Sequence, residues 1–357
     1  MARKRRNRKS GKKWLRIVYI SLLILFASAL FKGIDVYNKI LQSNVEVSGE
    51  TDGYFYIPTG SSFEDVCNKL QREGIVRNIN TFKWVAEKKN YINHIYAGRY
   101  KIKDGMNNNE LVNLLRSGIQ EPVHVRFQHI RSLGELSGTV AKNIEADSTE
   151  IMAFLKDKDF IASYGFQAHE VISMFIPNTY ELYWNTSAEE FFKRMAKEYK
   201  KFWNEERIQK ARKLNLSQTQ VITLASIVQA EQTIRPDERP KVAGLYINRL
   251  RKGMRLESDP TIIFAKGDFS IKRVLNEDRK VDSPYNTYKH SGLPPGPINI
   301  PDISSIDAVL NFQNHDFIFM CAKEDFSGYH NFSKTNAQHN IYAQRYRNEL
   351  NKRKIYR

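Results

Sequence analysis

One carboxylate in this sequence stands at a position where it could take part in acid–base chemistry. Residues 217–232 read SQTQVITLASIVQAEQ, and their periodicity predicts a helix. Its positions i, i+3, i+4 and i+7 hold three aliphatic residues and one carboxylate, Leu224, Ile227, Val228 and Glu231. Glu231 therefore shares the face that should pack into the core, where burial raises the pKa of a carboxyl group. A glutamic acid that stays protonated near neutral pH can act as a general acid.

The same residues also fit a purely structural interpretation. Glu231 ends the predicted helix, and Arg235 and Arg239 follow it at i+4 and i+8. An ion pair with either arginine would hold the carboxylate ionised at the surface. Both interpretations stay open at this point, and the surroundings of the Glu231 carboxyl group decide between them.

Other kinds of active site find little support in the sequence. The eight histidines form no HExxH pattern and no short pair with a nearby third ligand, so no metal and no cofactor are expected. No serine lies in a GxSxG turn. The two cysteines, Cys67 and Cys321, are too few for a disulfide framework.

A second candidate region is a stiff loop that could hold a ring-shaped polar ligand. Residues 283–298 read SPYNTYKHSGLPPGPI, and Asp259-Pro260 precedes them. Four prolines restrict the loop, while Tyr285, Asn286 and Tyr288 offer stacking surfaces and amide hydrogen bonds. This mixture suits a sugar. The alternative is a rigid connection that binds nothing.

The amino terminus has the pattern of a membrane anchor. Residues 17–31 (IVYISLLILFASALF) carry no charge, and the apolar stretch extends over residues 14–37. At about 1.5 Å per residue this length can cross a hydrocarbon core of about 30 Å. Residues 1–16 carry a net charge of +9, whereas residues 32–50 carry −1. The positive-inside rule then places the amino terminus in the cytoplasm and the rest of the chain outside. A cleaved signal peptide, with Ala27-Ser28-Ala29 as its site, and a buried core helix are the alternatives.

The charge of the chain belongs to its two ends. The net charge is +17, but residues 1–16 hold +9 and residues 345–357 hold +5. The 328 residues between them hold only +3, which argues against a nucleic-acid partner. The basic amino terminus fits topology and contact with anionic lipid.

The elements that must position the candidate residues predict an α+β chain with several parts. We expect a basic cytoplasmic tail at residues 1–13, a transmembrane anchor at 14–37 and a polar stalk at 38–51. A small α/β unit follows at 52–121, then a larger mixed unit at 122–345 and a basic tail at 346–357. Hydrophobic residues make up 41% of the chain, enough for packed cores. Mixed helices and strands without βαβ alternation favour the α+β class.

Four ordered motifs resemble a known family. They are LASIVQAE (224–231), VAGLYINRLRKGMRLESDPT (242–261), YNTY (285–288) and GLPPGPI (292–298). Together with FIPNTYELY (175–183) and HNFSKTNAQHN (330–340), they resemble the YceG-like family of endolytic murein transglycosylases. The resemblance covers roughly residues 14–345. It implies that the small unit is LysM-like and that the larger unit is the YceG-like catalytic domain.

The resemblance implies a catalytic role for Glu231 and a peptidoglycan substrate. The family cleaves glycan strands internally to leave 1,6-anhydromuramyl ends, and such cleavage would terminate or trim nascent strands. Asp259, Tyr285, Asn286, Thr287 and Tyr288 fall on motif positions expected to line the cleft and bind substrate. Many relatives carry another glutamate two positions before the catalytic one, where this chain has Gln229. The implied surroundings are the bacterial inner membrane and its lipid, with peptidoglycan synthases as further partners.

Two rival functions stay open. A glycoside hydrolase would use two carboxylates, with Glu231 as the acid and Asp259 as the base. A non-catalytic envelope protein would bind peptidoglycan and act as a scaffold. The products formed from isolated sacculi distinguish these possibilities.

Overall fold

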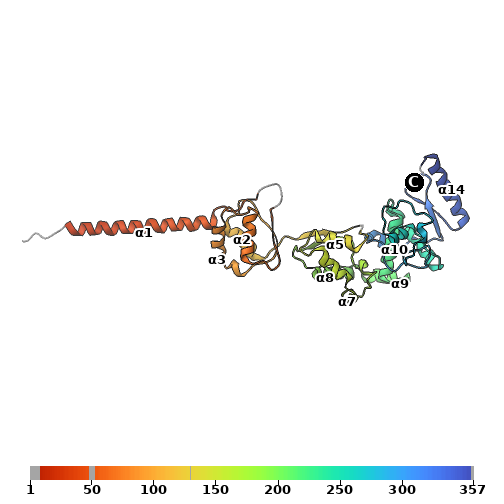
Figure 1. The fold of residues 1–357 in the computed structure, drawn as a ribbon, viewed down its shortest axis with the longest axis horizontal. Helices are drawn as coiled ribbons and strands as arrows, with labels where there is room; N and C mark the ends of the chain where they lie inside the picture. Colours follow the sequence, from red (N-terminus) through yellow and green to blue (C-terminus); the bar gives the residue numbers. More distant parts are fainter. Residues whose placement is uncertain (1–8, 48–52, 129, 355–357) are drawn as a thin grey trace, which may run out of the picture. The chain divides into compact units, whose positions relative to one another are not determined.

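The computed structural model describes residues 9–47, 53–128 and 130–354 (Figure 1). The chain divides into two compact units. The small unit contains the described residues up to 122 together with 183–185, and the large unit contains 123–182 and 186–354. Within the described residues, every sheet is a two-stranded antiparallel pair, so the α+β prediction is confirmed.

The small unit begins with one long helix, α1 (Lys9–Leu41). The helical segment Lys13–Leu41 is long and apolar enough to cross a membrane. Its mean hydropathy is 2.2, and its apolar stretch is not buried within the protein. A signal sequence near an amino terminus meets the same criterion. The helix starts before the predicted anchor, and residues 1–8 of the predicted basic tail lie outside the described residues.

The predicted stalk at 38–51 differs from the structure. Helix α1 continues to Leu41, and the next residues join the small unit through backbone bridges between Ser43 and Asn107 and between Val45 and Val76. Val45 is fully buried, because the alternating sequence of this segment gives it an apolar side chain on the core face. Residues 48–51 of the predicted stalk lie outside the described residues.

The rest of the small unit packs helices against two short strands. Its elements are β1 (Tyr54–Ile57), α2 (Phe63–Arg72), α3 (Ile79–Lys88), η1 (Tyr91–Asn93), β2 (Gly98–Lys101) and α4 (Asn108–Ser117). Strands β1 and β2 pair antiparallel, with Phe55 opposite Tyr100. Capping boxes begin α2 at Ser62 and α4 at Asn107, and Gly118 in the left-handed conformation ends α4.

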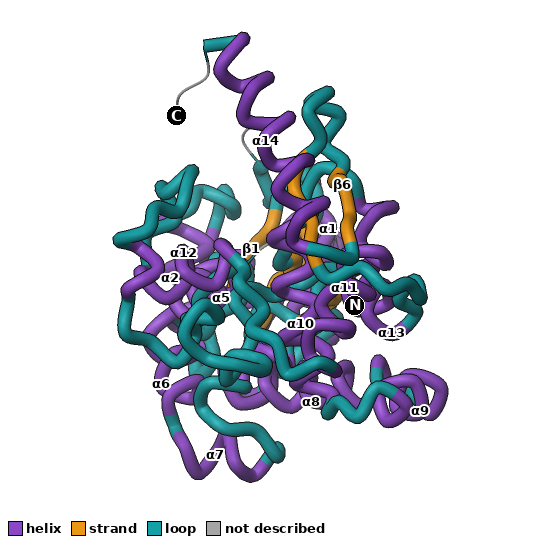
Figure 2. Tube along the Cα trace, turned by 90° about the vertical axis from the view of Figure 1, so that its right-hand side faces the viewer, coloured by secondary structure: helices purple, strands orange, loops and turns teal. Residues whose placement is uncertain are grey.

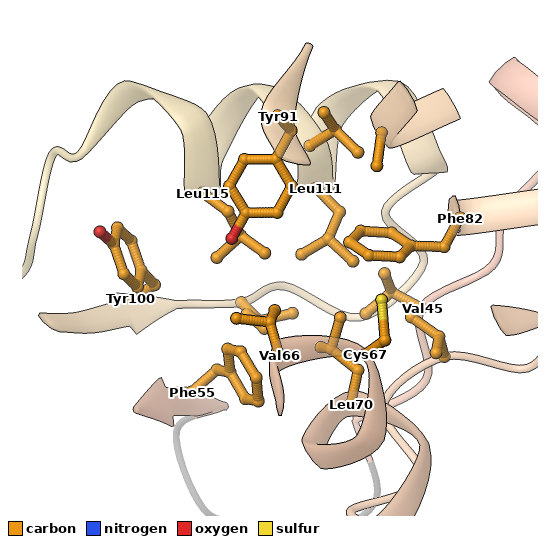
Figure 3. Close-up of a cluster of buried hydrophobic side chains, with 14 of the residues drawn as sticks. Val45, Phe55, Val66, Cys67, Leu70, Phe82, Tyr91, Tyr100, Leu111 and Leu115 are labelled. Carbon is orange, nitrogen blue, oxygen red and sulfur yellow. The ribbon is translucent and has the colours of Figure 1, made fainter. Parts of the chain in front are cut away.

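An apolar and aromatic core stabilises the small unit (Figure 3). Phe55, Leu70, Phe82 and Leu111 are fully buried in it. Burying a side chain of this size contributes about 1.5–3 kcal/mol relative to exposure. Cys67 belongs to the same core, and burial raises the pKa of its thiol to about 12. The thiol therefore behaves as a small apolar group.

Two buried asparagines fasten the end of α1 to the small unit. The Asn44 amide donates a hydrogen bond to Oδ1 of Asn108 at 2.7 Å. The Asn108 amide in turn donates to the carbonyl oxygen of Lys39, inside α1, at 2.8 Å and to Oγ1 of Thr81 in α3 at 3.0 Å. The helix and the small unit therefore share buried hydrogen bonds as well as apolar contacts.

The large unit begins with a helical layer beside one strand pair. Its elements are β3 (Val123–Arg126), α5 (Leu133–Ala141), α6 (Ser148–Lys156), α7 (Lys158–Ser163), η2 (Val171–Met174), β4 (Thr179–Leu182), α8 (Ala188–Phe202) and α9 (Glu205–Lys213). Strands β3 and β4 pair antiparallel. Phe127, Phe175, Phe191 and Phe192 pack with offset or edge-on rings beneath them.

The remainder of the large unit surrounds one buried helix. Its elements are α10 (Gln218–Glu231), η3 (Pro236–Glu238), α11 (Arg239–Arg251), α12 (Asp259–Lys266), η4 (Asp278–Lys280), α13 (Ile303–Leu310), β5 (Phe319–Ala322), β6 (His330–Ser333) and α14 (Asn336–Lys352). Helices α11, α12 and α13 pack against α10, and α14 lies beside β5 and β6 (Figure 2). Helix α14 also includes residues 346–352 of the predicted basic tail, and 355–357 lie outside the described residues.

Helix α10 is more deeply buried than its apolar stripe predicts. Every residue from Val221 to Gln229 is buried, so the helix has no solvent-facing side over that span. Polar side chains on it therefore need partners inside the protein. Oγ of Ser226 accepts a hydrogen bond from the backbone of Ile298 at 3.0 Å, and Oε1 of Gln229 accepts one from Asp302 at 2.6 Å.

Candidate active site

The Glu231 carboxyl group lies at the carboxyl end of α10, in the wall of a cavity of about 410 Å³. Its Oε1 atom accepts two hydrogen bonds, from the hydroxyl of Tyr246 at 2.8 Å and from Oγ of Ser258 at 2.5 Å. Within the part of the chain that the structure describes, no hydrogen bond reaches Oε2 of Glu231. A protonated carboxyl group would therefore carry its proton on Oε2, because Oε1 already accepts from two donors.

Burial raises the pKa of Glu231, and the negative charge of Asp259 acts in the same direction. The hydrogen bonds from Ser258 and Tyr246 and the charge of His330 act in the opposite direction but do not cancel the rise. The last carbonyl groups of α10 also disfavour an anion at this end of the helix. Glu231 is thus placed to hold a proton at a pH where exposed glutamates have lost theirs.

Neither arginine that could have neutralised Glu231 does so. Nε of Arg235 donates to the carbonyl oxygen of Ser327 at 2.8 Å. Nε of Arg239 donates to the carbonyl oxygen of Gln232 at 3.0 Å and thereby satisfies the end of α10. The ion-pair interpretation of Glu231 is therefore wrong for this structure.

Tyr246 reaches Glu231 from α11. Its ring is buried. Burial, and to a smaller extent the adjacent Glu231, raises the pKa of the Tyr246 hydroxyl well above its ordinary value. The hydroxyl therefore stays protonated and remains a donor. Gly244 lies two residues before Tyr246 in α11, and a Cβ atom at this position would come within 2.3 Å of the carbonyl oxygen of Gln313. This close approach lets α11 pack against the loop after α13, with Tyr246 facing α10.

Ser258 reaches Glu231 from the first turn of α12. It occupies the N-cap position, yet its hydroxyl makes no capping bond and donates to Glu231 instead. The preceding residue, Glu257, has a left-handed backbone with φ of 55° and pairs with Arg249. A non-glycine residue in this conformation is strained and persists only where its surroundings hold it. Arg249 and the backbone of Thr287 provide that hold.

Two residues predicted to line the cleft are buried instead. Asn286 is 0% exposed, and its amide donates to the carbonyl oxygens of Arg279 at 2.9 Å and Val281 at 2.7 Å. Thr287 is 2% exposed, and its Oγ1 atom accepts from the backbone N–H of Ser258 at 3.0 Å. The expectation that they contact substrate is corrected, because both side chains are used within the protein.

Of the other predicted residues, two line the cavity and one does not. Asp259 and Tyr288 line the same cavity as Glu231, and the Tyr288 hydroxyl donates to Oδ1 of Asp259 at 2.5 Å. The Arg279 guanidinium lies 4.6 Å from the centre of the Tyr288 ring. Tyr285 is absent from this lining and packs against Phe264, with ring centres 4.8 Å apart.

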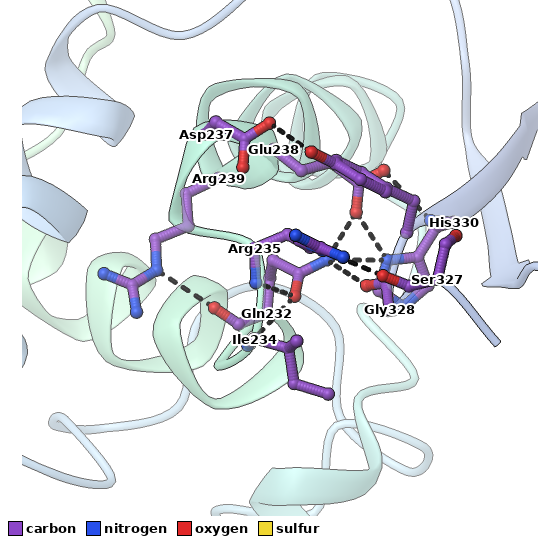
Figure 4. A network of polar contacts seen from close by, with 10 residues as sticks. Gln232, Ile234, Arg235, Asp237, Glu238, Arg239, Ser327, Gly328 and His330 are labelled. Carbon is purple, nitrogen blue, oxygen red and sulfur yellow. Dashed lines mark hydrogen bonds and ion pairs between the residues drawn. The ribbon is translucent and has the colours of Figure 1, made fainter.

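A buried polar network begins at the residue after Glu231 and includes His330, which lines the same cavity (Figure 4). Gln232, the next residue, donates through Nε2 to Oε2 of Glu238 at 2.5 Å. Nδ1 of His330 lies 2.7 Å from the same oxygen, and His330 lines the cavity. Two segments that are distant in sequence, residues 232–238 and the start of β6, thus meet beside the candidate acid.

The motif-based predictions missed three residues that complete the site. Tyr246, Ser258 and His330 all lie within stretches that carry the family resemblance, but they were not singled out. A donor to Glu231 cannot be recognised from helical periodicity, because Tyr246 and Ser258 are 15 and 27 residues away. The useful signal for Tyr246 and Ser258 was the hydroxyl group that each carries within the motif at 242–261.

The fold and the site together define an α+β protein with a buried carboxyl group of raised pKa in the wall of a cavity. The chain belongs to the YceG-like family, whose model matches residues 55–345. An endolytic murein transglycosylase of Bacillus subtilis (strain 168) is 28% identical over 337 residues, which is 90% of this chain and 92% of that protein. An endolytic murein transglycosylase of Streptococcus pneumoniae (strain ATCC BAA-255 / R6) is 26% identical over 341 residues, 85% of this chain and 60% of that protein.

A solved structure also resembles this chain. It is the 2.6 Å crystal structure of a yceG-like protein from Listeria monocytogenes, with a TM-score of 0.54 and 27% sequence identity. The match covers 81% of this chain and 97% of that one. The shared fold therefore extends well beyond the helix that carries Glu231.

Proposed function

We propose that this chain is an endolytic murein transglycosylase. It would cleave the glycosidic bond between N-acetylmuramic acid and N-acetylglucosamine inside peptidoglycan strands and leave 1,6-anhydromuramyl ends. Family membership and the names of the bacterial relatives support the activity. The observation that carries the assignment in this chain is the Glu231 carboxyl group, which has a raised pKa and lies in the wall of the cavity.

Glu231 would first act as the general acid. Its proton on Oε2 passes to the glycosidic oxygen as the bond from that oxygen to C1 of the muramyl residue breaks. Tyr246 and Ser258 hold Oε1 in place and stabilise the carboxylate as it forms. General acid–base catalysis of this kind contributes about 10²–10⁴-fold in rate.

The carboxylate would then act as the base for ring closure. It removes the proton from the muramyl 6-hydroxyl, whose oxygen attacks C1. The new bond makes the 1,6-anhydro ring, and the proton returned to Glu231 restores the starting state. No water is consumed, so one carboxyl group suffices where a hydrolase would need two.

The residues around Glu231 would divide into substrate-facing and supporting groups. Asp259 and Tyr288 line the cavity and are the best placed of the predicted residues to meet the glycan. Asn286 and Thr287 would support them from behind, because Thr287 fixes Ser258 and Asn286 fixes the loop. Tyr285 would contribute to packing beside Phe264.

Helix α1 would anchor the enzyme in the inner membrane. Its length and hydropathy support a single span, and the nine basic residues at positions 1–16 support a cytoplasmic amino terminus. Both units would then lie outside the cytoplasm, beside the peptidoglycan and its synthases. The same basic residues suit anionic lipid.

The small unit would serve as a LysM-like module. Two antiparallel strands that enclose two helices in sequence support this proposal. Whether the unit binds glycan is tested by pull-down with sacculi, since a spacer would leave sacculus binding to the large unit alone.

A digest of isolated sacculi tests the assignment. Full-length protein in detergent micelles should release fragments with anhydromuramyl ends, and Glu231→Gln should lose this activity while it keeps its fold and a melting temperature no lower than that of the wild type. Glu206→Gln is the matched control, because Glu206 is an exposed glutamate on α9 that pairs with Lys210. Mass spectrometry of the products and circular dichroism are the measurements.

The products decide among the rival functions. Anhydro ends are about 18 Da lighter than hydrolysed ends, so hydrated products would establish the hydrolase with Asp259 as its second carboxylate. Retained cleavage by Glu231→Gln would refute the role of Glu231. Binding of sacculi by the wild type without any cleavage would favour the scaffold.

A further inference from the structure

The polar network beside Glu231 fixes the orientation of one histidine. His330 begins β6, and its backbone N–H donates to Oε1 of Glu238 at 3.0 Å. Its Nδ1 atom lies 2.7 Å from Oε2 of the same carboxyl group (Figure 4). Glu238 therefore holds His330 at two points, one on the backbone and one on the ring, and Glu238 is itself buried at the start of α11.

The charge of Glu238 determines which ring nitrogen carries the proton. Burial alone would raise the pKa of Glu238, but its hydrogen bonds with the ring and backbone of His330 and with Gln232 outweigh burial and lower it. A carboxylate can only accept hydrogen bonds, so Nδ1 of His330 must be the donor. The Gln232 amide donates to the same oxygen, which explains why it lies 3.2 Å from Nδ1.

The other ring nitrogen is left for the cavity. Among the residues that the structure describes, no hydrogen bond reaches Nε2 of His330. His330 and Glu231 line the same cavity, and the charge of His330 is among the influences on the pKa of Glu231. A carboxylate that holds one nitrogen of a histidine and leaves the other free is the arrangement by which proteins orient an imidazole for proton transfer.

We propose that His330 is a second proton-transfer residue of this site, with Glu238 as its positioning residue. This inference rests on the proposed function and divides its two steps between two groups. The O6–H bond of the muramyl residue breaks with its proton passing to Nε2, while O6 bonds to C1. The C1–O4 bond breaks, and O4 takes the proton of Glu231. The proton on Nε2 then returns to the Glu231 carboxylate through solvent in the cavity.

Several charged groups share the cavity with His330 and must be considered in its pH dependence. They are Glu231 of α10, Arg249 of α11, Glu257 and Asp259 at the start of α12, Arg279 of the following loop and His339 of α14. Burial, and then the charges of Arg249 and Arg347, lower the pKa of His339. A variant that changes only His330 therefore separates the effect of this residue on the pH dependence from the effects of the other charged groups.

The test is the pH dependence of anhydro-end formation by the full-length protein in detergent. His330→Asn should lower the maximal rate about 100-fold, within the range of a lost general base. It should also remove the decline of the wild-type rate at acidic pH, because that decline reports protonation of the base. Glu238→Gln should shift the acidic decline and lower the rate less. His124→Asn is the control, since His124 is exposed on β3 and pairs with Glu181.

A second variant keeps the test decisive if the network also matters for folding. His330→Ala leaves space in the cavity wall, and added imidazole should restore part of its rate. A wild-type rate and pH profile in His330→Asn would overturn the inference, and so would a reduced rate with an unchanged profile and no rescue. A wild-type protein that forms no anhydro ends would instead overturn the proposed function and this inference with it.

Discussion

The two compact units bury polar groups very differently. Among the described residues of the small unit, Asn44 and Asn108 are the only polar side chains classed as buried, and they bond to each other. In the large unit, buried polar and charged side chains gather around the end of α10, and they include Gln232, Glu238, Arg239, Arg249, Ser258, Asn286 and Thr287. The small unit is held by apolar contact, whereas the candidate site is held by hydrogen bonds.

An apolar core and a buried polar network specify different properties of a protein. Apolar packing tolerates exchange of similar side chains and specifies mainly a shape. A buried polar network is costly unless every member is satisfied, but a satisfied network fixes the direction of each group. In the large unit such a network fixes the direction of the Glu231 carboxyl group in the cavity wall, while burial raises its pKa.

The largest effect on stability should come from the apolar core. Phe82→Ala removes a fully buried ring from the small unit and should lower its free energy of unfolding by about 3–5 kcal/mol. The rate of glycan cleavage per folded molecule should stay near the wild-type value. Calorimetry and initial rates measured below the transition check this. A rate that falls as far as in Glu231→Gln would break the comparison between the units.

A smaller loss should follow when the asparagine pair is broken. Asn108→Ala leaves the Lys39 carbonyl oxygen and the Asn44 amide without their partner and should cost about 1–3 kcal/mol. Hydrogen exchange at residues 36–41 should accelerate at the same time. The exposed Asn113→Ala on the same helix serves as the control. Unchanged exchange would mean that apolar contacts alone hold α1.

In the large unit, loss of one donor should move a pKa more than it changes stability. Ser258→Ala removes a hydrogen bond that favours the ionised form of Glu231, so the pKa of Glu231 should rise further. The decline of activity at alkaline pH, which reports loss of the acid's proton, should therefore move to higher pH. The pH–rate profile is the measurement. A shift to lower pH would contradict the assignment of Ser258 as a donor to the charged form.

The smallest expected effect is a gain in stability from removal of the candidate acid. The folded state binds the Glu231 proton more tightly than the unfolded chain does, so wild-type stability falls as pH rises from the ordinary glutamate pKa to the raised one. Glu231→Gln lacks this loss. Its melting temperature should exceed that of the wild type by an amount that grows over this pH window and then levels off. A difference that does not change with pH would show that the carboxyl group is not strained by burial.

Local sequence patterns predicted much of the fold. The helices that begin after Ser62, Ser187 and Ser217 start at serines whose side chains cap them, a pattern that the sequence displays. Short-range hydrogen bonds fix such starts, and a sequence displays them directly. The predicted stalk differs from the structure because Val45 is buried in the core and the side chain of Asn44 bonds within the small unit.

The candidate site was predictable only in part for the same physical reason. The position of Glu231 near the core follows from helical spacing, which is local. Its donors come from α11 and α12, and the buried state of Asn286 and Thr287 depends on how the loop packs against Ser258. Such contacts depend on tertiary packing, so polar residues in a proline-rich loop looked like a binding surface when they serve as internal supports.

The junction at Leu41 has a consequence for how a membrane-bound form of this protein would move. A flexible tether would let the outer part drift and turn freely above the lipid. Here hydrogen bonds that link Lys39, Asn108 and Asn44 hold the last turn of α1 to the rest of the small unit. When the helix tilts or rotates in the bilayer, the small unit therefore tilts or rotates with it.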